Sequence, residues 1–176
     1  MPRSANSKQR ILDAASELAR TEGSAHLSLD AVAARAGISK GGLLYNFPTK
    51  TALLKALVQQ FIEHFEATLN AVGNAAGGGP LARDYFEVAL EDLQNARPPS
   101  SGLLAALSED PELLSPVRQF NRKLLDRMKS GSTDYTAVLM LFMVLEGMRC
   151  QKLLGTEVLT ADERNNLLKR LEAMLG

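Results

Sequence analysis

Residues 28–48 read SLDAVAARAGISKGGLLYNFP, and this stretch decides the fold. Ser28 is placed to cap a short helix that Gly37 ends, because serine accepts hydrogen bonds from free N–H groups and glycine adopts the left-handed conformation that closes helices. Ser39 is placed to cap a second short helix, which must end before Pro48. Two short helices separated by a three-residue turn have the dimensions of a helix-turn-helix.

Outside this stretch, apolar residues recur at every third or fourth position and strand signals are almost absent, so we expect an all-α protein of about nine helices. The glycine-rich segment 73–80 is the clearest break. The capping-box pattern of Thr160 and Glu163 marks the start of the last helix. The other helices are expected near 6–22, from Thr49 to about Val72, and near 80–96, 110–129 and 133–154, with a loop at 97–102 that runs into a helical turn at 103–107.

Composition excludes several classes of protein. The chain has 176 residues, of which 45% are hydrophobic and 23% charged, as in ordinary globular proteins. Its one cysteine, Cys150, cannot form an internal disulfide, and His26 and His64 lack the spacing of a metal site. Residues 1–10 do not resemble a signal peptide, and the longest apolar run, 137–145, is too short to span a bilayer. We therefore expect a cytoplasmic protein without metal or cofactor.

Charge is unevenly distributed along the chain although its net value is zero. Residues 1–55 hold eight basic and four acidic side chains, whereas the remainder holds twelve basic and sixteen acidic ones. A basic end on an acidic body fits a protein that presents one end to a polyanion.

Three runs of residues resemble the N-terminal domain of TetR/AcrR-family transcriptional regulators: Arg10-Ile11-Leu12-x-Ala14-Ala15, Leu29-x-x-Val32-Ala33-x-x-Ala36-Gly37-Ile38-Ser39-Lys40-Gly41 and Phe47-Pro48-x-Lys50-x-x-Leu53-Leu54. The resemblance implies a three-helix DNA-binding head at 5–65, with the helix-turn-helix at about 28–47. A long fourth helix joins it to a helical effector-binding and dimerisation body at 66–176. It also implies a homodimer that binds a small-molecule effector in its body. We expect it to bind a palindromic operator and to be released by the effector, and to act as a repressor because occlusion of a promoter needs only a dimer and DNA.

The polar residues of the motif are the expected DNA contacts. Ser39 as a cap leaves N–H groups at a positive helix end, which suits a phosphate. Lys40 and Lys50 are placed to neutralise phosphates, and Asn46, or Lys40 instead, suits base edges. The expected DNA-binding set is Ser28, Ser39, Lys40, Gly41, Gly42, Leu44, Tyr45, Asn46 and Lys50. Apolar residues of the same helices form the expected core: Ile11, Leu12, Ala15, Leu18, Leu29, Val32, Ala33, Ala36, Ile38, Leu43 and Phe47.

Two features of the motif stay open. Gly41 and Gly42 are costly inside a helix, which indicates either close approach to the sugar–phosphate wall or a frayed first turn. Many family members have tyrosine where this chain has Leu44, and here the tyrosine follows at Tyr45. Leu44 suits a thymine methyl group, while Tyr45 either bonds a phosphate or packs inside.

The body is expected to supply a dimer interface and a ligand pocket. The helix at 133–154 is apolar around more than one face, so one side is free to meet a partner unless the helix is wholly internal. The expected interface is Leu139, Phe142, Leu145, Leu167, Leu168, Leu171 and Leu175. Aromatic and methionine side chains adapt to apolar ligands or form plain core, and the candidates are Phe61, Phe65, Tyr85, Phe86, Phe120, Met140 and Met143.

Two other functions remain as alternatives. A helical adaptor that binds only protein is disfavoured by the charged and amide groups Lys40, Asn46 and Lys50 at one end. A small all-α enzyme is disfavoured because the sequence has no phosphate loop, nucleophile set or metal-spacing motif. His64, beside Glu63, is expected to face solvent rather than to act as an acid or base.

Overall fold

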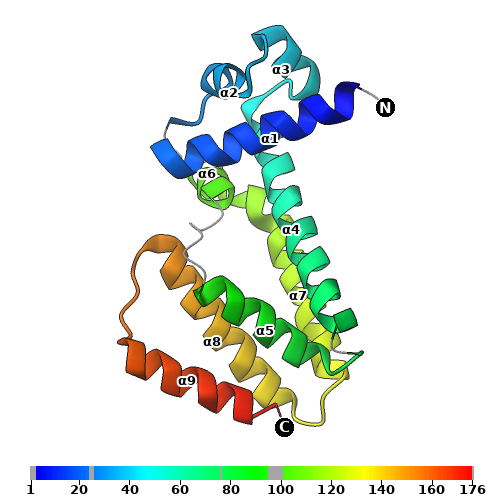
Figure 1. Ribbon diagram of the computed structural model, residues 1–176, viewed down its shortest axis with the longest axis vertical. Helices are drawn as coiled ribbons and strands as arrows, with labels where there is room; N and C mark the ends of the chain where they lie inside the picture. The colour runs from blue at the N-terminus through cyan, green and yellow to red at the C-terminus, as the bar shows by residue number, and fades with distance from the viewer. Residues whose placement is uncertain (1–2, 24–25, 76, 95–100, 176) are drawn as a thin grey trace. The chain divides into compact units, whose positions relative to one another are not determined.

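The computed structural model describes residues 3–23, 26–75, 77–94 and 101–175 (Figure 1). Within these ranges the chain forms nine α-helices and one short 3-10 helix, without any strand, which confirms the all-α prediction. None of the helices in the described ranges has both the length and the apolar character needed to cross a bilayer.

The helix boundaries follow the sequence signals closely, with two differences. A nine-residue helix replaces the expected turn at 103–107, and the expected helix at 110–129 is divided after Leu114. Most of the expected loop at 97–102 lies outside the described residues. The elements are α1 (Arg3–Glu22), α2 (Leu29–Ala36), α3 (Lys40–Asn46), α4 (Lys50–Ala75), α5 (Leu81–Gln94), α6 (Ser101–Glu109), η2 (Pro111–Leu114), α7 (Ser115–Ser130), α8 (Tyr135–Leu154) and α9 (Ala161–Ala173).

The chain divides into two compact units, each described separately below. The head unit comprises residues 1–63 together with 100–119, and the body unit comprises 64–99 and 120–176. The helices α4 and α7 contribute residues to both units. A segment far along the chain, α6 and η2, therefore belongs to the same unit as the helix-turn-helix.

Short-range signals set the ends of α2 and α3. The Ser28 hydroxyl accepts a hydrogen bond from the Ala31 N–H at 3.2 Å, and the Ser39 hydroxyl accepts one from Gly42 at 3.1 Å. Gly37 ends α2 with φ of +64°, a conformation that side-chain-bearing residues rarely adopt. The predicted caps are thus confirmed.

The head core contains most of the predicted residues, with corrections at three positions. Ile11, Val32 and Leu43 are completely buried. Leu29 and Ile38 are only half-buried, whereas the unpredicted Leu27 is 1% exposed. Leu27 directly precedes the Ser28 cap, where an apolar residue staples the entering chain against the helix, and this signal was available in the sequence.

Small residues bring α6 close to the rest of the head. Ala105 and Ala106 are buried, and a Cβ added at Gly102 would lie 3.2 Å from the Leu57 Cβ of α4. Helix α6 also packs against α1. The glycine is therefore needed for close packing against α4.

Candidate functional site

Helix α3 has one buried and one exposed face. Leu43 is fully buried, while Leu44 is 36% and Tyr45 83% exposed. A tyrosine ring left in water has no packing role within the subunit. Of the two interpretations of Tyr45, packing inside is therefore excluded.

The two glycines at the start of α3 differ in their surroundings. A Cβ at Gly42 would lie 3.3 Å from the Ser39 hydroxyl that caps the helix, whereas a Cβ at Gly41 would meet nothing within 4 Å. Both glycines lie inside the hydrogen-bonded helix, so the first turn is formed. Nothing inside the head requires glycine at position 41.

Both lysines expected at DNA phosphates are paired with carboxylates. Lys40 Nζ lies 2.9 Å from Asp30 in α2, and both side chains are well exposed. Lys50 Nζ lies 2.8 Å from Glu109 at the end of α6, and each is about one-third exposed. A phosphate would have to replace these carboxylates as the partner of each lysine.

Asn46 makes a local hydrogen bond. Its side-chain amide donates to the Gly42 carbonyl at 2.9 Å, and the residue is half-buried. The side chain must rotate away from its own helix before it pairs with a base edge. Ser28 and Ser39 likewise use their hydroxyl oxygens as helix caps.

The body unit gathers only some of the predicted pocket residues. Phe65 packs edge-on against Phe120 with centroids 5.9 Å apart, and it lies 6.2 Å from the ring of Tyr85. Phe86 is buried in the same core. Met140 and Met143, however, are 48% and 65% exposed on α8, and Phe61 belongs to the head unit. Periodicity alone did not distinguish the inner from the outer residues of a helix apolar on several sides.

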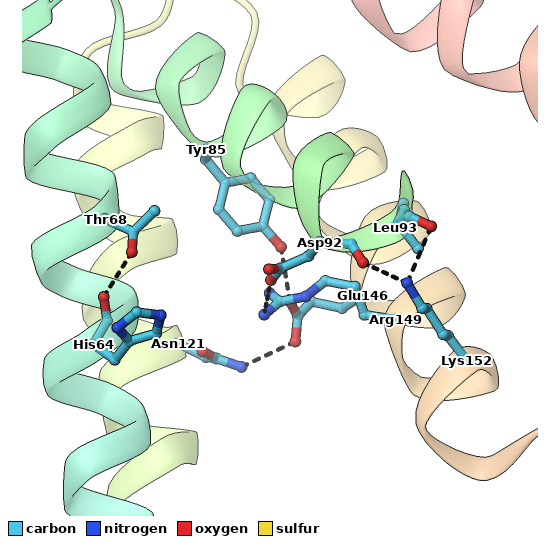
Figure 2. Close-up of polar contacts among 9 residues, drawn as sticks. All are labelled: His64, Thr68, Tyr85, Asp92, Leu93, Asn121, Glu146, Arg149 and Lys152. Carbon is cyan, nitrogen blue, oxygen red and sulfur yellow. Dashed lines mark hydrogen bonds and ion pairs between the residues drawn. The ribbon is translucent and has the colours of Figure 1, made fainter. Parts of the chain in front are cut away.

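A polar network, which the sequence analysis missed, includes the Tyr85 hydroxyl (Figure 2). Glu146 of α8 accepts hydrogen bonds from the Tyr85 hydroxyl at 2.8 Å and from the Asn121 amide at 3.2 Å. Arg149 donates to Glu146 at 2.8 Å and to Asp92 of α5 at 3.1 Å. The Arg149 guanidinium carbon also lies 4.7 Å from the centroid of the Phe65 ring.

Burial and charge change the proton affinity of this network. Burial, reinforced by the neighbouring Glu146 carboxylate, raises the pKa of Tyr85 well above its usual value, so the hydroxyl remains a donor. Burial alone would lower the pKa of Arg149, but Glu146 and the other partners outweigh it and the pKa lies above its ordinary value. The guanidinium is therefore charged at every physiological pH.

The predicted dimer interface requires correction at four of its seven residues. Phe142, Leu145, Leu168 and Leu171 are at most 8% exposed and belong to the core of their own subunit. The other three predicted residues are half-buried against that core: Leu139, Leu167 and Leu175. These residues pack in one core with residues of α5 and α7, and the spacing of apolar residues along a single helix does not reveal such partners.

The outer side of α8 carries a different stripe. Exposed apolar and small residues alternate at intervals of four and three, which places them on one face. They are Thr136, Met140, Met143, Gly147, Cys150 and Leu154. Within the described residues, no group of histidine, cysteine and carboxylate side chains is arranged to hold a metal ion.

Two models of known protein families match the N-terminal and C-terminal parts of the chain. The family model "Bacterial regulatory proteins, tetR family" matches residues 11–57, and "Tetracyclin repressor-like, C-terminal domain" matches residues 79–176. No curated protein matches the sequence significantly.

Solved structures resemble the chain over nearly its whole length. The multidrug binding protein EbrR, solved with malachite green, is 27% identical with a TM-score of 0.71, over 96% of this chain and 98% of that one. The regulator SCO7518 of Streptomyces coelicolor A3(2) is 20% identical with a TM-score of 0.69, over 97% and 98%. A TetR-family regulator of Mesorhizobium loti is 21% identical with a TM-score of 0.70, over 99% and 98%. The last two show similarity of fold.

Proposed function

This chain belongs to the TetR family of transcriptional regulators, and from that premise we propose that it is a repressor that binds a palindromic operator as a homodimer and leaves it when a small organic effector binds. Membership makes it a ligand-responsive DNA-binding regulator rather than an enzyme or a protein-only adaptor. We assign DNA binding to residues 5–65, effector binding and dimerisation to 66–176, and the cytoplasm as its location.

The observation that carries the DNA-binding proposal is the outward face of α3. Tyr45 and Leu44 point a phenol and an apolar group into solvent from a helix that Leu43 fixes to the core. Lys40 is the first residue of the helix, and Lys50, the first residue of α4, follows its end by four residues. This fits a recognition helix whose middle meets bases and whose flanks meet phosphates.

The test begins with the DNA beside the coding region, searched for an inverted repeat and used in a gel shift. Tyr45→Ala is expected to weaken operator binding at least ten-fold, because the exposed ring is proposed to contact the DNA. Tyr135→Ala, which removes an exposed ring from the body unit, is the matched control and is expected to bind like the wild type. Equal operator affinities for the two variants would contradict the proposal.

The homodimer is proposed to form along the outer stripe of α8, against a second copy. Met140, Met143 and Leu154 are large apolar side chains exposed on one helix face, and Gly147 between them permits close approach of another helix. Two-fold pairing presents two recognition helices to half-sites about 34–36 Å apart.

The dimer proposal is tested by placing a charge in the stripe. Met143→Glu is expected to give a folded monomer by light scattering and circular dichroism, with little operator binding, because one head alone binds near the nonspecific range. Lys123→Glu, an exposed site on α7, is the control and stays dimeric. A Met143→Glu protein that remains dimeric at micromolar concentration would place the interface elsewhere.

The effector site is proposed to lie in the body unit at the aromatic cluster of Phe65, Tyr85 and Phe120. Support comes from the rings gathered beside a polar network, and from EbrR, which is a multidrug binding protein. Aromatic rings with a few oriented polar groups are the composition of small-molecule sites.

A further inference from the structure

The polar network of the body unit already contains a planar cation, the guanidinium of Arg149. The Arg149 side chain is only 18% exposed, and its N–H groups reach Glu146 and Asp92 (Figure 2). Its guanidinium carbon lies over the Phe65 ring, 4.7 Å from the centroid. A ring face together with carboxylates in partial burial is the arrangement that recognises flat, delocalised cations.

We propose that the effector is a planar organic monocation, with an amidinium-like or aryl-cation group, that takes the place of the Arg149 guanidinium between Phe65 and Glu146. The proposal rests on the proposed function, because it takes the body unit as the effector-binding part. It adds the charge and shape of the ligand, and it assigns Arg149 as the group that the ligand displaces.

Glu146 is built to keep its orientation when Arg149 leaves. The Tyr85 hydroxyl and the Asn121 amide, from α5 and α7, hold both of its oxygens, and neither donor carries a charge. Withdrawal of the guanidinium would thus leave an oriented, partly buried carboxylate whose charge is no longer compensated. Such a group favours a replacement cation strongly over a neutral molecule.

The charges around the site oppose an anionic ligand. Two carboxylates, Glu146 and Asp92, face the guanidinium of Arg149. Lys152, three residues after Arg149 on α8, donates to the backbone carbonyls of Asp92 and Leu93 at the end of α5. An anion at the Phe65 ring would be repelled by the two carboxylates, and the Lys152 ammonium group, which is bonded to carbonyls, would not offset that repulsion.

Displacement of Arg149 would also change how α5 is held. Arg149 and Lys152 tie α8 to the last turn of α5, the first through the Asp92 carboxylate and the second through two carbonyls. A ligand that removes Arg149 breaks the first tie and leaves the second. The site thereby links ligand charge to the position of a helix end within the body unit.

The experiment compares three ligands that share one benzene ring: benzamidinium, benzamide and benzoate. Calorimetric titration of the full chain without DNA is expected to give at least ten-fold tighter binding of benzamidinium than of benzamide, and the weakest binding for benzoate. Glu146→Gln is expected to remove the preference for the cation. Glu172→Gln, an exposed carboxylate of α9, is the matched control and keeps it.

The change in benzamidinium affinity in Arg149→Met decides whether Arg149 competes with the ligand, because methionine keeps an apolar side chain and removes the cation. Benzamidinium is expected to bind this variant at least ten-fold tighter than the wild type. Weaker binding, or a wild-type preference for benzoate, would overturn the proposal by making Arg149 the ligand's partner. If thermal melting shows Arg149→Met to be unfolded, Phe65→Leu takes its place, and an unchanged cation preference in Phe65→Leu overturns the proposal.

Operator binding separates this inference from the proposed function. A protein that binds its operator but shows no cation preference in the titration overturns the inference and leaves the proposed function intact. Cation binding that requires Glu146 but leaves the operator complex unchanged in a gel shift supports the site and contradicts its role in release.

Discussion

The helix-turn-helix of the head and the polar network of the body are built from contacts of very different range. Ser28 and Ser39 are satisfied by groups three residues away, and Lys40 pairs with a carboxylate ten residues away. Tyr85 reaches Glu146 across 61 residues, and Arg149 reaches Asp92 across 57. The geometry of a motif held by local contacts can therefore be predicted from the sequence, whereas the geometry of a network assembled from distant helices cannot.

The largest effect is expected from a charge at Leu171. This residue is 3% exposed in the body core, although the apolar stripe of its helix predicted that it lies in the dimer interface. Leu171→Glu is expected to destabilise the body by at least about 4 kcal/mol, because it buries an unpaired charge. Chemical denaturation followed by circular dichroism measures the loss. Lys169→Glu, exposed on the same helix, should stay near the wild type. A well-folded Leu171→Glu monomer would restore the interface inferred from the stripe.

Gly41 tests whether the local motif also encodes its DNA contact. Since an added Cβ meets nothing, Gly41→Ala should stabilise the head by roughly 0.5–1 kcal/mol while weakening operator binding about ten-fold through a clash with the sugar–phosphate wall. Melting curves and gel shifts measure the two effects separately. Unchanged operator affinity would mean that this turn stands clear of the DNA.

Tyr85→Phe examines the long-range network with one atom removed. The loss of a hydrogen bond to the Glu146 carboxylate should cost about 1.5 kcal/mol of folding stability. Because both residues lie in the body unit, operator affinity without effector should not change. A stability equal to that of wild type would show that Asn121 and Arg149 suffice to hold Glu146.

The smallest expected effect concerns Asp30, the local partner of Lys40. Asp30→Asn removes a negative charge beside a lysine assigned to phosphate, so operator affinity should rise two- to five-fold with a steeper salt dependence. Folding should change little, because exposed ion pairs contribute at most about 1 kcal/mol. Weaker DNA binding by Asp30→Asn would instead show that Asp30 positions Lys40 for its contact.

The sequence was sufficient for most of the helices and for the caps of α2 and α3, because these depend on neighbours within one or two turns. It left open whether Tyr45 faces solvent or the core. It did not reveal that Lys50 pairs with Glu109 or that Met140 and Met143 lie outside the body core. It also passed over Glu146 and Arg149, since single charged residues in an apolar helix carry no signal until their partners from α5 and α7 are known.

The membership of α6 in the head unit affects how this protein can be recombined with others. Ala105 and Ala106 are buried there, Gly102 lies against Leu57, and Glu109 holds Lys50. A chimaera that joins residues 1–63 to the body of another protein would thus lack part of the packing of the head unit. The transferable module is discontinuous, so a graft that carries residues 100–119 together with the N-terminal helices is the exchange that keeps the head intact.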